Sequence, residues 1–76
     1  MFRCHVCGAT ESRTEDVSEV FVVDGRRILV EHIPAQVCVH CGEATFGRET
    51  TEKVRRMVHG GAEPVGVVRL EVFEFA

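Results

Sequence analysis

The chain has 76 residues, and one domain is the most that this length supports. Hydrophobic residues make up 45% of it and charged residues 28%, which excludes a disordered chain, but a core this small is marginal without a disulfide, a metal or a partner. The formal net charge of −3 disfavours a nucleic-acid binder, because neutralising phosphates requires a basic surplus.

A β-hairpin is predicted in the first half of the chain. A tight Cys-His-Val-Cys-Gly turn at residues 4–8 is followed by a polar stretch, residues 9–16, which we expect to be a loop or a frayed strand. Residues 17–23 are rich in Val and Phe and favour a strand. Asp24 and Gly25 then form a two-residue turn, since both tolerate the positive φ that such a turn requires. The return strand is expected over residues 26–33, with Ile28, Val30 and His32 on one face and Pro34 ending it.

A helix is predicted after the second cysteine turn, Cys-Val-His-Cys-Gly at residues 38–42. Thr50, Val54, Met57 and Val58 share one face at helical spacing, which predicts a helix over residues 48–59. Gly60 and Gly61 are expected to stop it.

A C-terminal strand is predicted over residues 64–76. Its apolar residues do not keep one face: Val68, Leu70 and Val72 lie on one side of an extended chain, and Phe73 and Phe75 on the other. Either a bulge switches faces, or the strand is covered on both sides. A strand of this kind most often completes the domain's own sheet, but these five residues are also the candidate partner-binding residues, through strand addition.

The four cysteines are the candidate metal ligands. The N-terminus has no apolar signal segment and no run approaches transmembrane length, so we expect a cytoplasmic protein without membrane contact, in which thiols stay reduced. Two Cys-x-x-Cys pairs can each aim both sulfurs at one ion, and we expect Cys4, Cys7, Cys38 and Cys41 to bind one structural Zn²⁺. Iron is the main rival metal, while disulfides or a redox pair are the weaker alternatives.

No catalytic residues are predicted, and we do not expect an enzyme. A closed site of four cysteines has no open position for water or substrate. His5 and His40, inside the cysteine turns, are expected to face solvent, since four thiolates already fill a tetrahedron. Five basic residues flank the hairpin turn or lie on the predicted helix: Arg26, Arg27, Lys53, Arg55 and Arg56. We interpret them as an ordinary solvated surface. In the alternative function, that of a zinc-ribbon nucleic-acid-binding domain, they would contact the phosphates. A structural homodimer with paired C-terminal strands is a further alternative.

A family resemblance rests on four segments in order: CHVCG at residues 4–8, VDGR at 23–26, VEHIPA at 30–35 and CVHCGE at 38–43. With these the chain resembles the YgiT-type zinc-finger family and is similar to the zinc-binding N-terminal domain of MqsA antitoxins. The closing EVFEF at 71–75 is similar to the strand-like ends of stand-alone members. The resemblance implies a zinc-binding domain over residues 1–62, with residues 63–76 as a strand or tail of the same domain or for a partner.

The resemblance also implies a function. It is that of an antitoxin-like module of a bacterial toxin–antitoxin system, which neutralises a small basic ribonuclease toxin by binding it. No helix-turn-helix domain follows in this sequence, so we expect no sequence-specific DNA binding by that route. The expected fold is a small α+β zinc-ribbon-like domain with two cysteine knuckles, a β-hairpin, one helix and a C-terminal strand.

Overall fold

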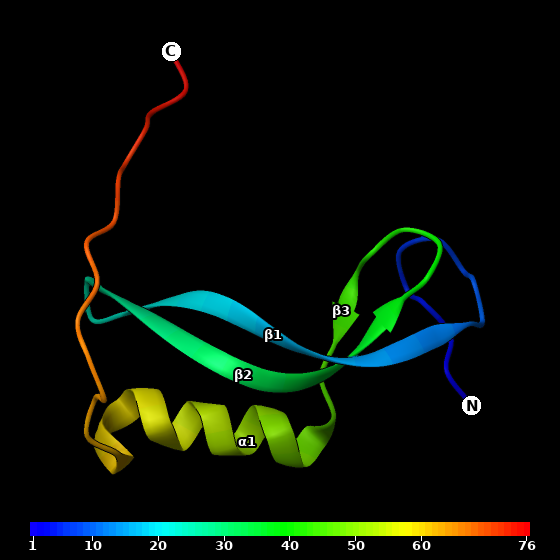
Figure 1. Cartoon of the computed structure of the whole chain (residues 1–76), viewed down its shortest axis with the longest axis horizontal. Helices are drawn as coiled ribbons and strands as arrows, with labels where there is room; N and C mark the ends of the chain where they lie inside the picture. The colour runs from blue at the N-terminus through cyan, green and yellow to red at the C-terminus, as the bar shows by residue number, and fades with distance from the viewer.

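A long antiparallel hairpin forms the frame to which the other elements attach (Figure 1). A computed structural model describes residues 1–60 and 62–76. The elements are β1 (Ser12–Val23), β2 (Arg26–Cys38), β3 (Ala44–Thr45), α1 (Arg48–Arg56) and a last helical turn, η1 (Met57–Gly61). The three strands form one sheet in the order β1-β2-β3, so the α+β zinc-ribbon-like class is confirmed. Among the described residues, no helix has the length and apolar character needed to cross a membrane.

The hairpin turn has the predicted geometry. Val23 pairs with Arg26, and the two residues between them have positive φ, 50° at Asp24 and 79° at Gly25. Positive φ at both central positions gives the turn a twist that matches the twist of the strands, and aspartate followed by glycine is a sequence that tolerates it. The register of the hairpin therefore starts from a locally encoded turn.

A β-bulge in β2 changes which residues face the core. Val17 pairs with Ile33 but Glu19 pairs with Val30, so Ser18 alone faces two residues of β2. One of these two, His32, has a φ of 60°, in the left-handed region. The bulge shifts the alternation by one residue. The buried residues of β2 are Val30 before the bulge and Ile33, Ala35, Val37 and Cys38 after it. The prediction that His32 shares a face with Ile28 and Val30 is therefore wrong, and His32 is exposed.

Both strands extend further than the sequence patterns predict. β1 begins at Ser12, within the polar stretch, because Gln36 of β2 holds that stretch in the ladder. The Ser12 hydroxyl donates to Gln36 Oε1 at 2.9 Å, and Gln36 Nε2 donates to Thr14 Oγ1 at 3.2 Å. β2 continues past Pro34 to Cys38, and proline is tolerated there because β3 pairs only with Gln36 and its neighbour Val37, leaving that edge of β2 open.

The core lies between the hairpin and the helix that runs along one face of it (Figure 1). It consists of Val23, Val30, Ile33 and Val58, with Val17, Phe21, Ile28, Phe46 and Val54 packed around them. α1 begins at Arg48 as predicted, and the helical path ends where Gly60 takes a φ of 99°. Met57, predicted to share a face with Val54 and Val58, is exposed and does not belong to the core.

The predicted C-terminal strand does not form in the free chain. Residues 62–76 belong to neither a helix nor a strand, and they leave the body at the end of the helix and project past the hairpin turn (Figure 1). Leu70 is 44% exposed and Phe75 fully exposed. A strand is stabilised by pairing with a neighbour, and this segment pairs with none of the described strands, so its apolar sequence alone does not give it regular structure.

Candidate metal centre

The first cysteine knuckle is a tight turn closed by backbone hydrogen bonds. The Gly8 N–H donates to the Cys4 carbonyl at 2.9 Å, and the Cys4 N–H donates to the Ala9 carbonyl at 2.8 Å. Gly8 has a φ of 78°, so a residue without Cβ is needed at the position directly after Cys7. This conformation turns the chain back on itself and places the Cys4 and Cys7 sulfurs on the same side.

The second knuckle repeats the first in every one of these details. The Gly42 N–H donates to the Cys38 carbonyl at 2.9 Å, the Cys38 N–H donates to the Glu43 carbonyl at 2.9 Å, and Gly42 has a φ of 80°. Cys38 is the last residue of β2, and Glu43 directly precedes β3, so the sheet fixes both ends of this knuckle. The second knuckle is also bonded to the segment between the first knuckle and β1, since the Val39 N–H donates to the Glu11 carbonyl at 3.2 Å.

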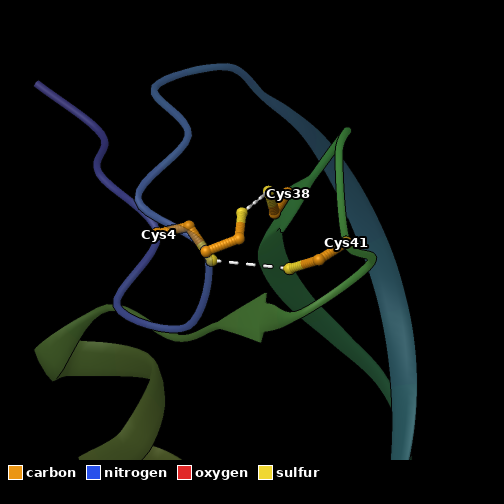
Figure 2. A group of neighbouring side chains, drawn as sticks. Cys4, Cys38 and Cys41 are labelled. Atoms are coloured by element: carbon orange, nitrogen blue, oxygen red, sulfur yellow. Dashed lines mark hydrogen bonds between the residues drawn. The ribbon is translucent and has the colours of Figure 1, made fainter.

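The two knuckles face each other and bring four sulfurs together (Figure 2). The Sγ atoms of Cys4 and Cys41 lie 3.6 Å apart, as do those of Cys7 and Cys38, and all four lie within 4.8 Å of one another. Four sulfurs at tetrahedral corners about 2.3 Å from one ion are separated by about 3.8 Å. The donor set and its dimensions therefore fit one metal ion held by all four predicted ligands.

Backbone N–H groups favour the thiolate at the first cysteine of each knuckle. The Cys7 N–H, aided by that of Val6, lowers the pKa of Cys4 to about 6, although burial opposes this. The Cys41 N–H, aided by that of His40, likewise lowers the pKa of Cys38. In each knuckle the backbone thus makes the thiolate of the first cysteine easier to form.

The second cysteine of each knuckle stays protonated more readily. At Cys7 the Ala9 N–H lowers the pKa, but desolvation and the neighbouring Cys38 sulfur outweigh it, and the pKa is raised. At Cys41 the Glu43 N–H is outweighed in the same way by desolvation and the other three sulfurs, and the pKa rises to about 12. Four adjacent thiolates repel one another, so full ionisation of this cluster requires a bound cation.

The centre is closed on the protein side and reaches the surface on the other. Cys4 and Cys38 are buried, whereas Cys7 and Cys41 are exposed. His5 is exposed and lies outside the sulfur cluster, with its Nε2 3.7 Å from Glu43 Oε2. Four protein ligands leave no coordination position for a substrate, which is the arrangement of a structural site.

The predicted partner-binding residues lie away from the metal centre. Val68, Leu70, Val72, Phe73 and Phe75 are all exposed. The knuckles hold the N-terminal end of the molecule, while the C-terminal segment extends from the opposite end, beside the hairpin turn (Figure 1). The structure therefore separates the end that carries the cysteine cluster from the end that carries the exposed apolar segment.

An apolar groove between hairpin and helix was not predicted. It has a volume of about 320 Å³ and its walls are mostly apolar. The lining residues are Phe21, Val22, Val23, Ile33, Phe46, Thr51, Val54, Arg55, Val58 and His59. The spacing of Val54 and Val58 indicates an apolar helix face, but only the packed structure shows that this face leaves a groove open.

Comparisons with known proteins add no relative to this description. A scan against protein-family models, a search of curated proteins and a search of solved structures all find no match to this chain.

Proposed function

We propose that the chain is an antitoxin-like protein-binding module, stabilised by one structural zinc ion, that neutralises a small basic ribonuclease toxin by binding it. The observation that carries the proposal is the exposed C-terminal segment, residues 62–76, with large apolar side chains attached to a metal-stabilised body. Exposed apolar residues that gather in one segment of a small protein are typical of an interaction site. The resemblance to the YgiT-type family supplies the class of partner.

Zinc is the metal we propose for the centre. Four thiolates in a tetrahedron suit Zn²⁺, which has no redox chemistry of its own and needs no further ligand here. Its binding would contribute about 10–16 kcal/mol to folding at neutral pH, which a chain with so small a core requires. Elemental analysis of the purified protein tests this, and a coloured preparation with one iron per chain would exclude zinc.

The charge of the chain supports a basic partner. The net charge of −3 steers an acidic protein towards a basic one and away from nucleic acid. A ribonuclease that binds RNA through basic residues offers the complementary surface. The proposed module needs no catalytic group, since occupying the toxin is sufficient to inhibit it.

The test is capture of the partner from an extract of the chain's own host, with and without nuclease, followed by an RNA-cleavage assay. We expect a small basic protein to be retained in stoichiometric amount after nuclease treatment, to cleave RNA alone, and to lose this activity when the chain is added back. A Phe75→Ser variant should capture less of it, and an Arg48→Ser variant, changed on the exposed start of α1, should capture as much as wild type. Recovery of nucleic acid alone would reject the proposal in favour of the alternative built on Arg26, Arg27 and the helix cations.

A further inference from the structure

The outer edge of β1 is open. β1 is the end strand of the sheet, so its 12 residues pair with β2 on one side only. A long unpaired edge presents backbone N–H and C=O groups that readily accept another strand. The last four of these 12 residues, Val20 to Val23, are all apolar, so a strand added there gains side-chain contacts as well as backbone hydrogen bonds.

The apolar groove reaches this same edge. Phe21 and Val23 line it from the face of β1 that packs towards the helix. Val22 also lines it, although alternation along a strand points its side chain to the opposite face. The groove therefore lies along the last three residues of β1, next to the free edge of that strand. Side chains of a strand added at this edge would lie beside the groove and could cover it.

The C-terminal segment has the spacing of β2 itself. In β2 the core-side residues before and after the bulge are Ile28, Val30, Ile33 and Ala35, at positions i, i+2, i+5 and i+7. Val68, Leu70, Phe73 and Phe75 repeat this spacing. With a bulge at Glu71 and Val72, these four side chains share one face, and Arg69 and Glu74 lie on the other. The C-terminal segment is then an amphipathic strand with a single apolar face.

We propose that the free chain forms a two-fold dimer in which the C-terminal segment of each copy pairs, as a bulged strand, with the outer edge of β1 of the other copy. Its four apolar side chains then cover the partner copy's groove. The proposal concerns the chain alone and does not rest on the proposed function.

A second copy fits because each chain offers one strand to donate and one edge to receive it. Reciprocal exchange satisfies both at once and closes the assembly. In the free chain the segment runs past the hairpin turn and away from the sheet instead of along its own β1 (Figure 1). Four phenylalanines, two from each copy, would bury roughly 600–1,000 Å². The side chains of Val68 and Leu70 and the paired backbone of both copies bring the total buried area into the range of about 1,200–2,000 Å² that stable interfaces bury.

The test is sedimentation equilibrium of the metal-loaded full chain over a wide concentration range. We expect a dimer, and we expect Leu70→Ser and Phe73→Ser each to raise its dissociation constant about tenfold or more, because each removes a large apolar side chain from the interface. Val72→Ser is the matched control, since the bulge turns Val72 away, and it should change the constant by less than about threefold. These residues are exposed in the free chain, so the variants leave the body folded, and circular dichroism checks this.

Hydrogen exchange identifies the surface used. In the dimer, amides on the outer edge of β1 and in residues 68–75 should exchange more slowly than at low concentration. A monomer at every concentration overturns the proposal and leaves the partner-binding function untouched. Three other results also overturn the proposal. The first is a dimer in which the β1 amides exchange as fast as in the monomer, and the second is a monomer whose C-terminal amides exchange slowly. The third is a Val72→Ser variant that dimerises as weakly as Phe73→Ser.

Discussion

Replacing His32 with valine tests the bulge in β2. If position 32 were an ordinary strand position, valine would fit it well, since β-branched residues are favoured on a pleated surface. The structure predicts the opposite, because His32 has a φ of 60° and a β-branched residue is a steric outlier in that region. His32 is exposed, so no buried contact is lost with the imidazole. The change in stability therefore reports the backbone conformation.

The expected loss follows from the cost of the left-handed conformation. That conformation costs an L-residue about 1–2 kcal/mol, and the cost is higher for β-branched residues than for histidine. Histidine already pays part of this cost, so we expect His32→Val to lower the free energy of unfolding by the difference, about 1 kcal/mol. A domain of this size loses about 4–8 °C in Tm for each kcal/mol. His32→Gly should equal or exceed wild type, since glycine adopts positive φ without a clash.

Thermal unfolding of the metal-saturated protein by far-ultraviolet circular dichroism measures this. The control is Glu19→Val, on the exposed surface of β1 opposite Val30, where φ is negative and valine should be neutral or slightly stabilising. If His32→Val melts at or above wild type, as the control does, the bulge is wrong and β2 alternates regularly through position 32.

Three further predictions concern the metal centre and one surface ion pair. Cys38→Ser removes a fully buried candidate ligand and should abolish both stoichiometric metal binding and cooperative unfolding. The control variant His40→Ala, two residues away, should keep both. Native mass spectrometry measures the bound metal, and thermal melts measure the cooperativity of unfolding. Lowering the pH should release the metal, because protons compete for the thiolates; retention well into strong acid, followed with a zinc-sensitive dye, would contradict a four-thiolate site. The Glu52 carboxylate accepts two hydrogen bonds from Arg55, and these lower the pKa of Glu52 in the folded protein. Any stability from this pair is therefore fully present above the pKa that Glu52 has in the unfolded chain. It is lost as the pH falls through the lower pKa that Glu52 has in the folded protein. Arg55→Ala should move the Glu52 titration, followed by NMR, to higher pH; an unchanged titration would show that the pair does not persist in solution.

The two cysteine turns and the hairpin turn could be predicted from the sequence because their chemistry is local. Cys-x-x-Cys-Gly fixes a turn within five residues, and the glycine that follows each pair takes the positive φ that the motif requires. The aspartate and glycine of the hairpin turn act in the same way. The start of the helix is also local, since the helical spacing begins directly after Gly47.

The face of β2 that enters the core was decided only by the tertiary structure. Alternation in the sequence places His32 with Val30, but pairing with β1 inserts a bulge and brings Ile33 to the core instead. The same holds for the polar start of β1, which joins the sheet because Gln36 lies opposite and hydrogen-bonds to it. Register depends on residues about twenty apart in sequence, and no local pattern contains it.

The C-terminal segment shows the difference between what the sequence determines and what only tertiary contacts decide. Its alternating apolar and charged residues determine that it can become a strand, and that was readable from the sequence. Whether it is one depends on a partner edge, and in the free chain the segment stays exposed. A helix forms its backbone hydrogen bonds within itself, but a strand forms them with a neighbouring strand. Whether a strand-forming sequence becomes a strand therefore depends on an available partner edge, which the sequence of the segment does not contain.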